Sequence, residues 1–211
     1  MTYDRHDIIR FLGAAAVVSI ADYLIVLTDC VIAGRVLGEV ALSGLNLLMP
    51  IFSLVTFVSW LVATAVSGSS FAASQHGEDR RAAELAGQGI VLSALIGIAL
   101  VVIMRAFEAP YLMFLAPDEN VQVFSGDFWK WYHLVVPFQM IFFTLGYLVY
   151  RRDGERICLL AYAVVAVVNL VASLILARKL GISGVSYGTL LSLASGIAVI
   201  GVWMRSPKSK V

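Results

Sequence analysis

The chain has 211 residues, of which 60% are apolar and only 14% are charged, and its net charge is +1. Soluble domains are about 45–50% apolar and about 25% charged, so a water-soluble globular protein is almost excluded. The mean hydropathy of +0.90 agrees with a membrane protein surrounded by lipid. The near-neutral charge offers no electrostatic case for a nucleic-acid partner.

Apolar runs bounded by charged residues predict an all-α membrane protein, a bundle of six transmembrane helices in a single domain, residues 1–211. In chain order the predicted spans are residues 11–33, 48–70, 85–104, 131–150, 157–177 and 184–204. The first run also resembles a secretory signal peptide, with Arg5 and Arg10 in front of it. Its apolar character continues beyond Asp22, so we expect a retained span.

The loop charges predict the orientation of these spans. With the N-terminus inside, cytoplasmic segments hold 10 of the 15 basic residues and outer segments hold 5. The positive-inside rule therefore places both termini in the cytoplasm, in a multi-pass protein of the cell (inner) membrane. Trp129, Trp131 and Tyr132 then fit an outer interfacial belt, and we expect the neighbouring His133 to be hydrated at that interface rather than to act as a proton relay.

Two acids, Asp22 and Asp29, lie within the first predicted span. An ionisable side chain there costs about 2.5–3.5 kcal/mol and marks a functional site by default. Seven residues make two helical turns, so both carboxylates face one side of the helix, roughly 10 Å apart. That face must meet water, a cation or a polar partner, which predicts a cation or proton site. The alternative is that Asp29, near the outer end, is simply hydrated at the interface.

Polar side chains in two later spans are candidate partners for these acids. Asn169 and Ser173 share one face of the fifth span, and Thr189 lies in the sixth. Around a carboxylate such oxygens suit a hard cation such as Na⁺, although each hydroxyl alone is equally explained by a bond to its own i−4 carbonyl. Pro50 in the second span and Pro137 in the fourth predict helix kinks or breaks, which transporters place around a cavity.

Two classes of enzyme are disfavoured by the residues that their chemistry requires. Residues 181–184 match the G-x-S-G motif of rhomboid-type intramembrane proteases, but every histidine of this chain precedes Ser183, whereas that class needs its base after the serine. The D-x-x-D-G run of lipid-phosphate transferases is absent, because the two intramembrane acids lie seven residues apart. We therefore expect a protein that is not an enzyme and that uses no cofactor beyond a coupling ion.

Six short runs, in the right order and spacing, resemble multidrug and toxic compound extrusion (MATE) transporters over about residues 10–203. They are residues 28–38 (TDCVIAGRVLG), 48–52 (LMPIF), 75–82 (QHGEDRRA), 136–138 (VPF), 151–154 (RRDG) and, after Asn169 of the fifth helix, 181–192 (GISGVSYGTLLS). In that family an N-terminal six-helix lobe pairs with a related C-terminal lobe around a central cavity. Inward movement of Na⁺ or H⁺ drives the export of cationic or amphipathic compounds.

The resemblance implies that Asp29, Asn169 and Thr189 form the cation site of the N-terminal lobe, with Na⁺ or H⁺ as the coupling ion and Asp29 as the coupling acid. It also shows one departure. Many members have an aspartate four residues after the asparagine, where this chain has Ser173, so one charge and one strong ligand are lost. Asp22 matches no acid of the family and is a candidate second acid that compensates.

The length of the chain corresponds to one lobe of such a transporter. We therefore expect multidrug efflux by cation-coupled antiport of a small amphipathic or cationic substrate, in a half-transporter or truncated form. Its partner would be a second copy, as a homodimer, or a second six-helix half. The alternatives are a non-transporting truncated or scaffold protein that needs a second half, and a related lipid-precursor flippase. A flippase is expected to carry basic residues facing its cavity, and the predicted spans contain no Lys or Arg.

Overall fold

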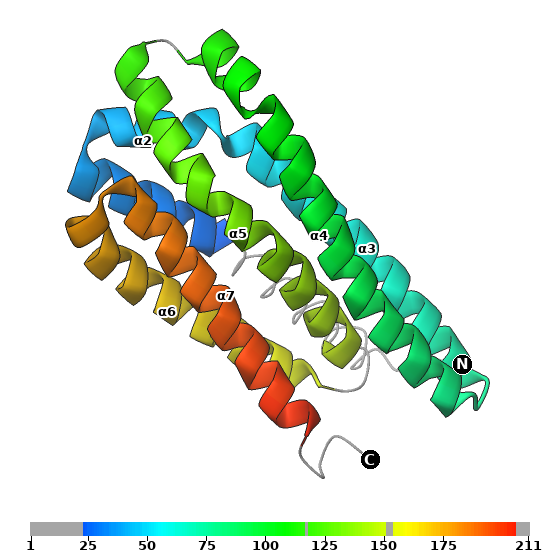
Figure 1. Cartoon of the computed structure of the whole chain (residues 1–211). Coiled ribbons are helices and arrows are strands. Elements are labelled where there is room, and N and C mark those ends of the chain that lie inside the picture. The colour runs from blue at the N-terminus through cyan, green and yellow to red at the C-terminus, as the bar shows by residue number, and fades with distance from the viewer. Residues whose placement is uncertain (1–22, 117, 151–153, 206–211) are drawn as a thin grey trace, which may run out of the picture.

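The computed structural model describes residues 23–116, 118–150 and 154–205, which form a bundle of long helices (Figure 1). Residues 23–32 are helical and lead into the first bounded element. The elements are the π-helical turn η1 (Ala33–Leu37) and the α-helices α2 (Glu39–Leu47), α3 (Met49–Gln75), α4 (Asp79–Leu115), α5 (Glu119–Tyr150), α6 (Glu155–Leu180) and α7 (Ile182–Met204). Asp22, most of the first predicted span and residues 151–153 of the predicted RRDG motif lie outside the described residues.

Five of these helices, α3 to α7, are long and apolar enough to cross a membrane. The predicted all-helical membrane fold is confirmed for the described residues. The count of six spans stays a prediction, because only the end of the first span, from residue 23, is described. Short α2 was not predicted, because the uncharged run that follows residue 39 hides the break in the helix at Leu48.

The apolar side chains that cover the outside of the bundle explain the composition. Val102, Phe107 and Val167 are each more than 60% exposed, and they belong to long helices whose opposite faces are packed. On a soluble protein such a surface would be an aggregation hazard. Around a bilayer-spanning bundle it is the surface that lipid chains cover, and the bundle itself is held by close packing and interhelical hydrogen bonds.

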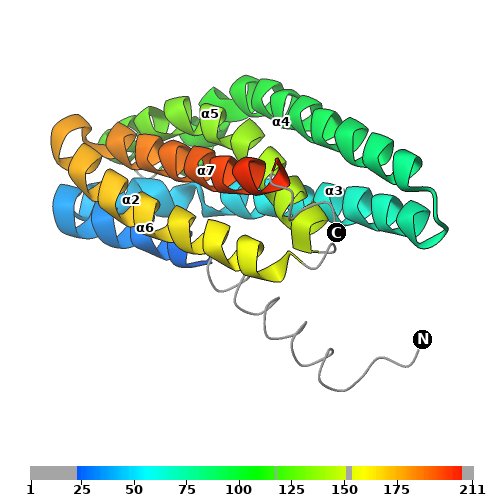
Figure 2. The ribbon, with the colours of Figure 1, turned by 90° about the horizontal axis from the view of Figure 1, so that it is seen from below.

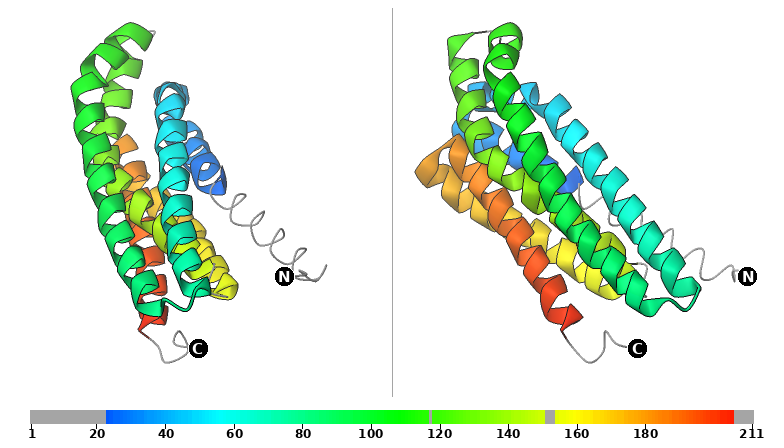
Figure 3. Two further views of the ribbon diagram at one scale, coloured as in Figure 1. Left: turned by 90° about the vertical axis from the view of Figure 1, so that its right-hand side faces the viewer. Right: turned by 45° about the vertical axis from the view of Figure 1, so that its right-hand side comes forward.

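Helix α5 lies at the centre and contacts α2, α3, α4, α6 and α7. In Figure 1 it runs between α4 on one side and α7 on the other. Helices α6 and α7 form an antiparallel hairpin, and α4 packs along both α3 and α5. Figures 2 and 3 show α3 and α4 side by side out to the turn that joins them at one end of the bundle. Helix α5 therefore has two packed faces, one against α4 and one against α7.

Small residues let α4 approach α5 closely. A Cβ added to Gly97 would lie 2.8 Å from the Cα atom of Pro137, and Ser93 of α4 is fully buried against Thr144 of α5. The two hydroxyl oxygens of Ser93 and Thr144 lie 2.7 Å apart and share one hydrogen bond. This bond joins the two helices deep inside the bundle.

We expect a double-mutant cycle on Ser93→Ala and Thr144→Val to give a coupling energy near 0.6 kcal/mol, the average measured for interhelical hydrogen bonds in a membrane bundle, where values reach about 1.7 kcal/mol. The measurement is the free energy of unfolding of the reconstituted protein. The control pairs Thr144→Val with Ser69→Ala, because Ser69 donates within its own helix to Val66. That control pair should be additive, and additivity in the Ser93–Thr144 cycle would contradict the prediction.

Two predictions about the α4–α5 region are wrong. The predicted outer loop between residues 104 and 131 is mostly helix, because α4 continues to Leu115 and α5 begins at Glu119. Arg105 and Glu108 end the apolar run but pair with each other at 2.7 Å one turn apart, so they extend the helix instead of ending it. Trp129, Tyr132 and His133 are buried in helix contacts, so they do not lie at a hydrated interface, whereas Trp131 is only partly buried and its place in an interfacial belt stays a prediction.

Candidate functional site

Asp29 lies in the last helical turn before η1 and is only 7% exposed. The π-helical turn that follows is a feature often found beside functional sites. It ends at Gly38, whose φ of 97° is a conformation that glycine adopts without strain. The turn leads the chain into α2 and leaves the Asp29 side chain facing α6 and α7. Its burial argues against the alternative of a carboxylate hydrated at the interface.

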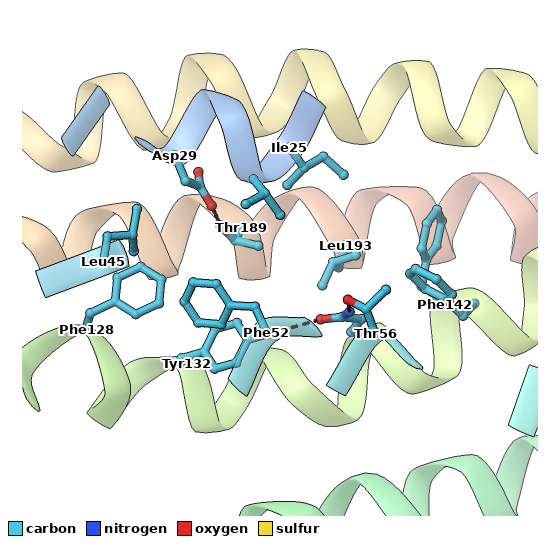
Figure 4. Close-up of a pocket in the computed structure, with 13 residues that line it drawn as sticks. Ile25, Asp29, Leu45, Phe52, Thr56, Phe128, Tyr132, Phe142, Thr189 and Leu193 are labelled. Atoms are coloured by element: carbon cyan, nitrogen blue, oxygen red, sulfur yellow. Dashed lines mark hydrogen bonds between the residues drawn. The ribbon is translucent and has the colours of Figure 1, made fainter. Parts of the chain in front are cut away.

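Three polar side chains from the α6–α7 hairpin surround this carboxylate. The hydroxyl of Thr189 donates to Oδ2 of Asp29 at 2.9 Å (Figure 4). The amide of Asn169 donates to Oδ1 at 3.1 Å, and the hydroxyl of Ser173 donates to the same oxygen at 3.5 Å. All three partners are buried. The structure therefore brings together the four residues that the sequence analysis grouped, across as many as 160 positions of the chain.

Glycine in α7 makes this meeting of helices feasible. A Cβ added to Gly188 would come within 2.5 Å of the backbone nitrogen of Ser173 and 2.6 Å of its Cα atom. Real Cβ atoms essentially never approach backbone so closely, so any larger residue would push α7 away from α6. Thr189 follows Gly188 directly, and its distance to Asp29 depends on this contact.

One polar atom of the site has no hydrogen-bond partner among the described residues. It is Oδ1 of Asn169, a fully buried side chain, whereas Nδ2 of the same amide lies 3.1 Å both from the hydroxyl oxygen of Thr189 and from Oδ1 of Asp29. Rotating the amide by half a turn would present an oxygen to the carboxylate, which is favourable only with a cation between them. The unpaired amide oxygen of Asn169 is therefore available as a further ligand for a cation beside Asp29.

The donor set suits a hard monovalent cation or a proton. Among the described residues Asp29 supplies the one negative charge of the site, and hydroxyl and amide oxygens supply neutral ligands. This is the oxygen chemistry that alkali and alkaline-earth cations prefer. Across the ranges that the structure describes, no group of three or more His, Cys, Asp and Glu side chains is placed to hold a metal ion.

Asp29 and Thr189 open onto a pocket between α3, α5 and α7 (Figure 4). Five of its 13 lining residues are aromatic. The ring centroids of Phe52 and Tyr132 are 4.6 Å apart, and those of Phe128 and Tyr132 are 5.7 Å apart. No Lys or Arg from the described part of the chain lines it. A carboxylate at the edge of a pocket with aromatic faces is the arrangement that attracts organic cations.

A polar pair marks the other end of this pocket. The amide of Gln139 donates to the hydroxyl of Thr56 at 3.0 Å, and the phenol of Tyr132 lies 3.4 Å from the amide oxygen of Gln139. Neither Gln139 nor Thr56 is a residue that the sequence pattern marked, and Tyr132 was predicted at the membrane interface instead. A glutamine within an otherwise apolar predicted span was the available signal for Gln139, but Thr56 and Tyr132 carry no comparable signal.

The two prolines lie close to this pocket. Pro50 occupies the first turn of α3, where its missing N–H leaves no hydrogen bond unmade. Pro137 lies inside α5, which continues as one helix through it. Pro50 follows the break in the helix at Leu48, so it starts the helix that carries Phe52 and Thr56 into the pocket.

Across the described residues, a bundle of long apolar helices with one buried carboxylate defines a polytopic membrane protein. The chain belongs to the MatE family, whose family model matches residues 14–175. The predicted membership of the MATE family is thereby confirmed.

Relatives and solved structures agree with this assignment. The chain is 25% identical over 183 residues to the probable multidrug resistance protein YoeA of Bacillus subtilis (strain 168). This alignment covers 83% of the chain and 39% of YoeA. The Vibrio cholerae MATE transporter VcmN in its bent form matches 93% of this chain with a TM-score of 0.86 at 19% identity. A MOP superfamily transporter from Pyrococcus furiosus Vc1 matches 97% with a TM-score of 0.79 at 18% identity.

These structures share the fold of the chain, and the match covers 45% of each of them. The chain therefore spans less than half the length of the relatives that it resembles.

Proposed function

We propose that this chain is one lobe of a cation-coupled exporter in the cell membrane, in which Asp29 binds the coupling ion. The observation that carries the proposal is the one carboxylate buried within the described part of the chain, which is held by hydroxyl and amide groups of α6 and α7 and opens onto a pocket with aromatic walls on one side. Membership of the MatE family and the likeness to YoeA, which is named a probable multidrug resistance protein, support an export function.

Both hydroxyls of the site have two acceptors to choose from. Thr189 lies 2.9 Å from Asp29 and 3.1 Å from the carbonyl of Val185, and Ser173 lies 3.5 Å and 3.3 Å from the same two groups. Without a coupling ion the hydroxyls donate to the charged carboxylate. When Na⁺ binds there, they turn their protons to Val185 and present their oxygens to the cation. A proton bound to Asp29 would release the hydroxyls to Val185 in the same way.

This exchange supplies the differential affinity that coupling requires. The hydrogen bonds that α6 and α7 donate to Asp29 are strong while the carboxylate is charged. They weaken when a bound ion neutralises the carboxylate and the hydroxyls turn to Val185. An organic cation in the aromatic pocket would neutralise the same carboxylate. The substrate and the coupling ion therefore compete for one charge, which makes their movements opposite in direction. Small amphipathic cations are the substrate class that the carboxylate and its aromatic neighbours would attract.

The lobe is proposed to act against a second six-helix lobe, supplied by another copy of this chain or by another polypeptide, with both termini cytoplasmic. The absence of basic side chains from the pocket, among the described residues, favours export of cations over the alternative of a flippase for anionic lipid precursors.

A thermal stability assay tests the ion site without requiring transport. If Na⁺ is the coupling ion, replacing K⁺ in the buffer by Na⁺ at constant ionic strength is expected to raise the apparent melting temperature of the purified protein. If the proton is the coupling ion, lowering the pH is expected to raise it. Ligand at 100 times its Kd stabilises by about 2.7 kcal/mol. The effect should vanish in Asp29→Asn and persist in Asp127→Asn, which removes an exposed acid. A wild-type protein that responds to neither ion would refute the assignment.

A further inference from the structure

A second buried ionisable group lies on the other side of α5, in its contact with α4. His133 is 7% exposed, and its Nε2 atom is 4.0 Å from Oε2 of Glu108 on α4. The same carboxylate oxygen accepts a hydrogen bond from Arg105 at 2.7 Å. These three residues form a cluster that Asp29 and its partners do not touch, because the Asp29 site faces α6 and α7.

Two side-chain atoms of this region lack hydrogen-bond partners within the part of the chain that the structure describes. They are Nε2 of His133 and Nε1 of Trp129, both buried, and their rings lie one turn apart with centroids separated by 6.4 Å. A buried polar atom without a partner costs about 1–3 kcal/mol. Such atoms are rare in folded proteins, so a buried pair of them needs a physical explanation.

The hydrogen bonds of His133 determine which of its ring nitrogens is free to bind a proton. The imidazole is hydrogen-bonded to the backbone of Lys130, one turn earlier, so in the neutral ring Nε2 carries the lone pair. The carboxylate of Glu108 is also only an acceptor, and two acceptors that face each other repel. A proton on Nε2 would turn the ring into a donor to Glu108 and make the pair attractive.

The charges around His133 come mainly from α4. Helices α3 and α7 contain no charged residue, and α2 contains only Glu39, at its first position. The remaining charged residues of the neighbouring helices α5 and α6 are Glu119, Asp127 and Lys130, and Glu155, Arg156, Arg178 and Lys179. The Lys130 side chain lies over the ring of Trp131, 5.7 Å from its centroid. Glu108, which attracts a proton, and Arg105, which repels it, are therefore the charges that act on the imidazole.

Water has a route to this cluster. Arg105 and Glu108 line an open pocket at the end of the bundle where α4 and α5 join, together with Glu119 and Gln122. Arg105 is itself 63% exposed. Protons can therefore exchange with the aqueous phase at this end without passing through the pocket of Asp29.

We propose that His133 and Glu108 form a proton-binding site between α4 and α5, separate from Asp29. The proton comes from water in the open pocket beside Glu108 and adds to Nε2 of His133. The attraction that results draws the two side chains from 4.0 Å to hydrogen-bond distance. The site gains one positive charge, and the bond ties α5 to α4 at this end of the bundle. The inference does not depend on the proposed transport function.

Trp129 provides a direct readout, because a protonated imidazole quenches the fluorescence of an indole beside it. The test uses the full chain in lipid nanodiscs with Trp60, Trp131 and Trp203 replaced by Phe, so that Trp129 alone emits. Its fluorescence is expected to fall with one proton-binding midpoint as the pH drops from about 8 to about 5, the range in which histidine titrates. His133→Gln should abolish this change, and His76→Gln, in the exposed turn between α3 and α4, should leave it intact.

The charged neighbours make the test specific. Glu108→Gln keeps the shape of the side chain but removes its charge, so the midpoint should move to lower pH by about one unit, a tenfold weaker proton affinity. Arg105→Gln removes the opposing charge and should move the midpoint to higher pH.

A flat signal in the parent protein, a titration that persists in His133→Gln, or a midpoint unmoved by Glu108→Gln would each overturn the proposal. If His133→Gln does not fold, nitrogen NMR of the ¹⁵N-labelled imidazoles in the parent protein decides the same question.

Discussion

Replacing Asp29 by asparagine is expected to abolish ion-gradient-driven export of a cationic dye by cells that produce this chain. Asparagine keeps the volume of the side chain and can still accept from Thr189, which donates to Asp29 at 2.9 Å. It cannot exchange its charge for Na⁺ or a proton, so the ion no longer favours one state of the bundle over another. Losing only about 1.4 kcal/mol of the difference in ion-binding free energy between the two states reduces the shift in their equilibrium about tenfold.

Two further variants make the result specific. Asp127→Asn neutralises an exposed acid of α5 and should export normally. Thr189→Val keeps the charge of Asp29 but removes a ligand, so it should weaken the ion dependence without abolishing it. Export by Asp29→Asn that still follows the ion gradient would disprove the role of Asp29, whereas a loss equal in Asp127→Asn would show a general effect on folding or insertion.

Replacing Gly188 by alanine is expected to destabilise the bundle and to disassemble the site of Asp29 at the same time. The added methyl group would lie within 2.5 Å of the backbone nitrogen of Ser173, and a helix backbone cannot yield as a flexible side chain does. Overpacking typically costs about 1–3 kcal/mol, and a clash with backbone belongs at the upper end of that range. The apparent melting temperature in detergent should fall by several degrees, and the protection by the coupling ion should disappear.

Gly201→Ala is the matched control, because Gly201 lies in the same helix and a Cβ there meets nothing within 4 Å. It should leave the melting temperature unchanged or slightly higher, since alanine is the better helix former. Equal stability of the Gly188 and Gly201 variants would contradict the close packing of α6 on α7 at this point.

Asp29 shows which parts of a site can be predicted from a membrane sequence. A carboxylate within an apolar run is costly unless it has partners, and only a few polar side chains in the later spans were available to provide them. The same reasoning was wrong for His133, because its position after Trp131 and Tyr132 suggested an interface. Its burial depends on α4 continuing beyond Arg105, and hydropathy reports the depth of a residue in the bilayer, not where its helix ends.

The pocket beside Asp29 could not be read from the sequence. Gln139 and Thr56, which form its polar end, are separated by 83 positions, and nothing in an apolar span shows which face will turn toward which neighbour. Phe52 and Tyr132 look the same in the sequence as the aromatic residues that face lipid. Their pairing depends on the packing of α3 against α5, which only the structure supplies.

Helix α4 has one more consequence, which concerns measurement. Its 37 residues extend about 55 Å, whereas the hydrocarbon layer is about 30 Å thick, so its two ends reach different aqueous compartments. The turn at Gly77 and the junction near Asp118 therefore report opposite sides of the membrane. A membrane-impermeant reagent would label only the position that faces the side from which it is added. Because α4 packs along both α3 and α5, these two labelling results would fix the orientation of all the described helices in the membrane.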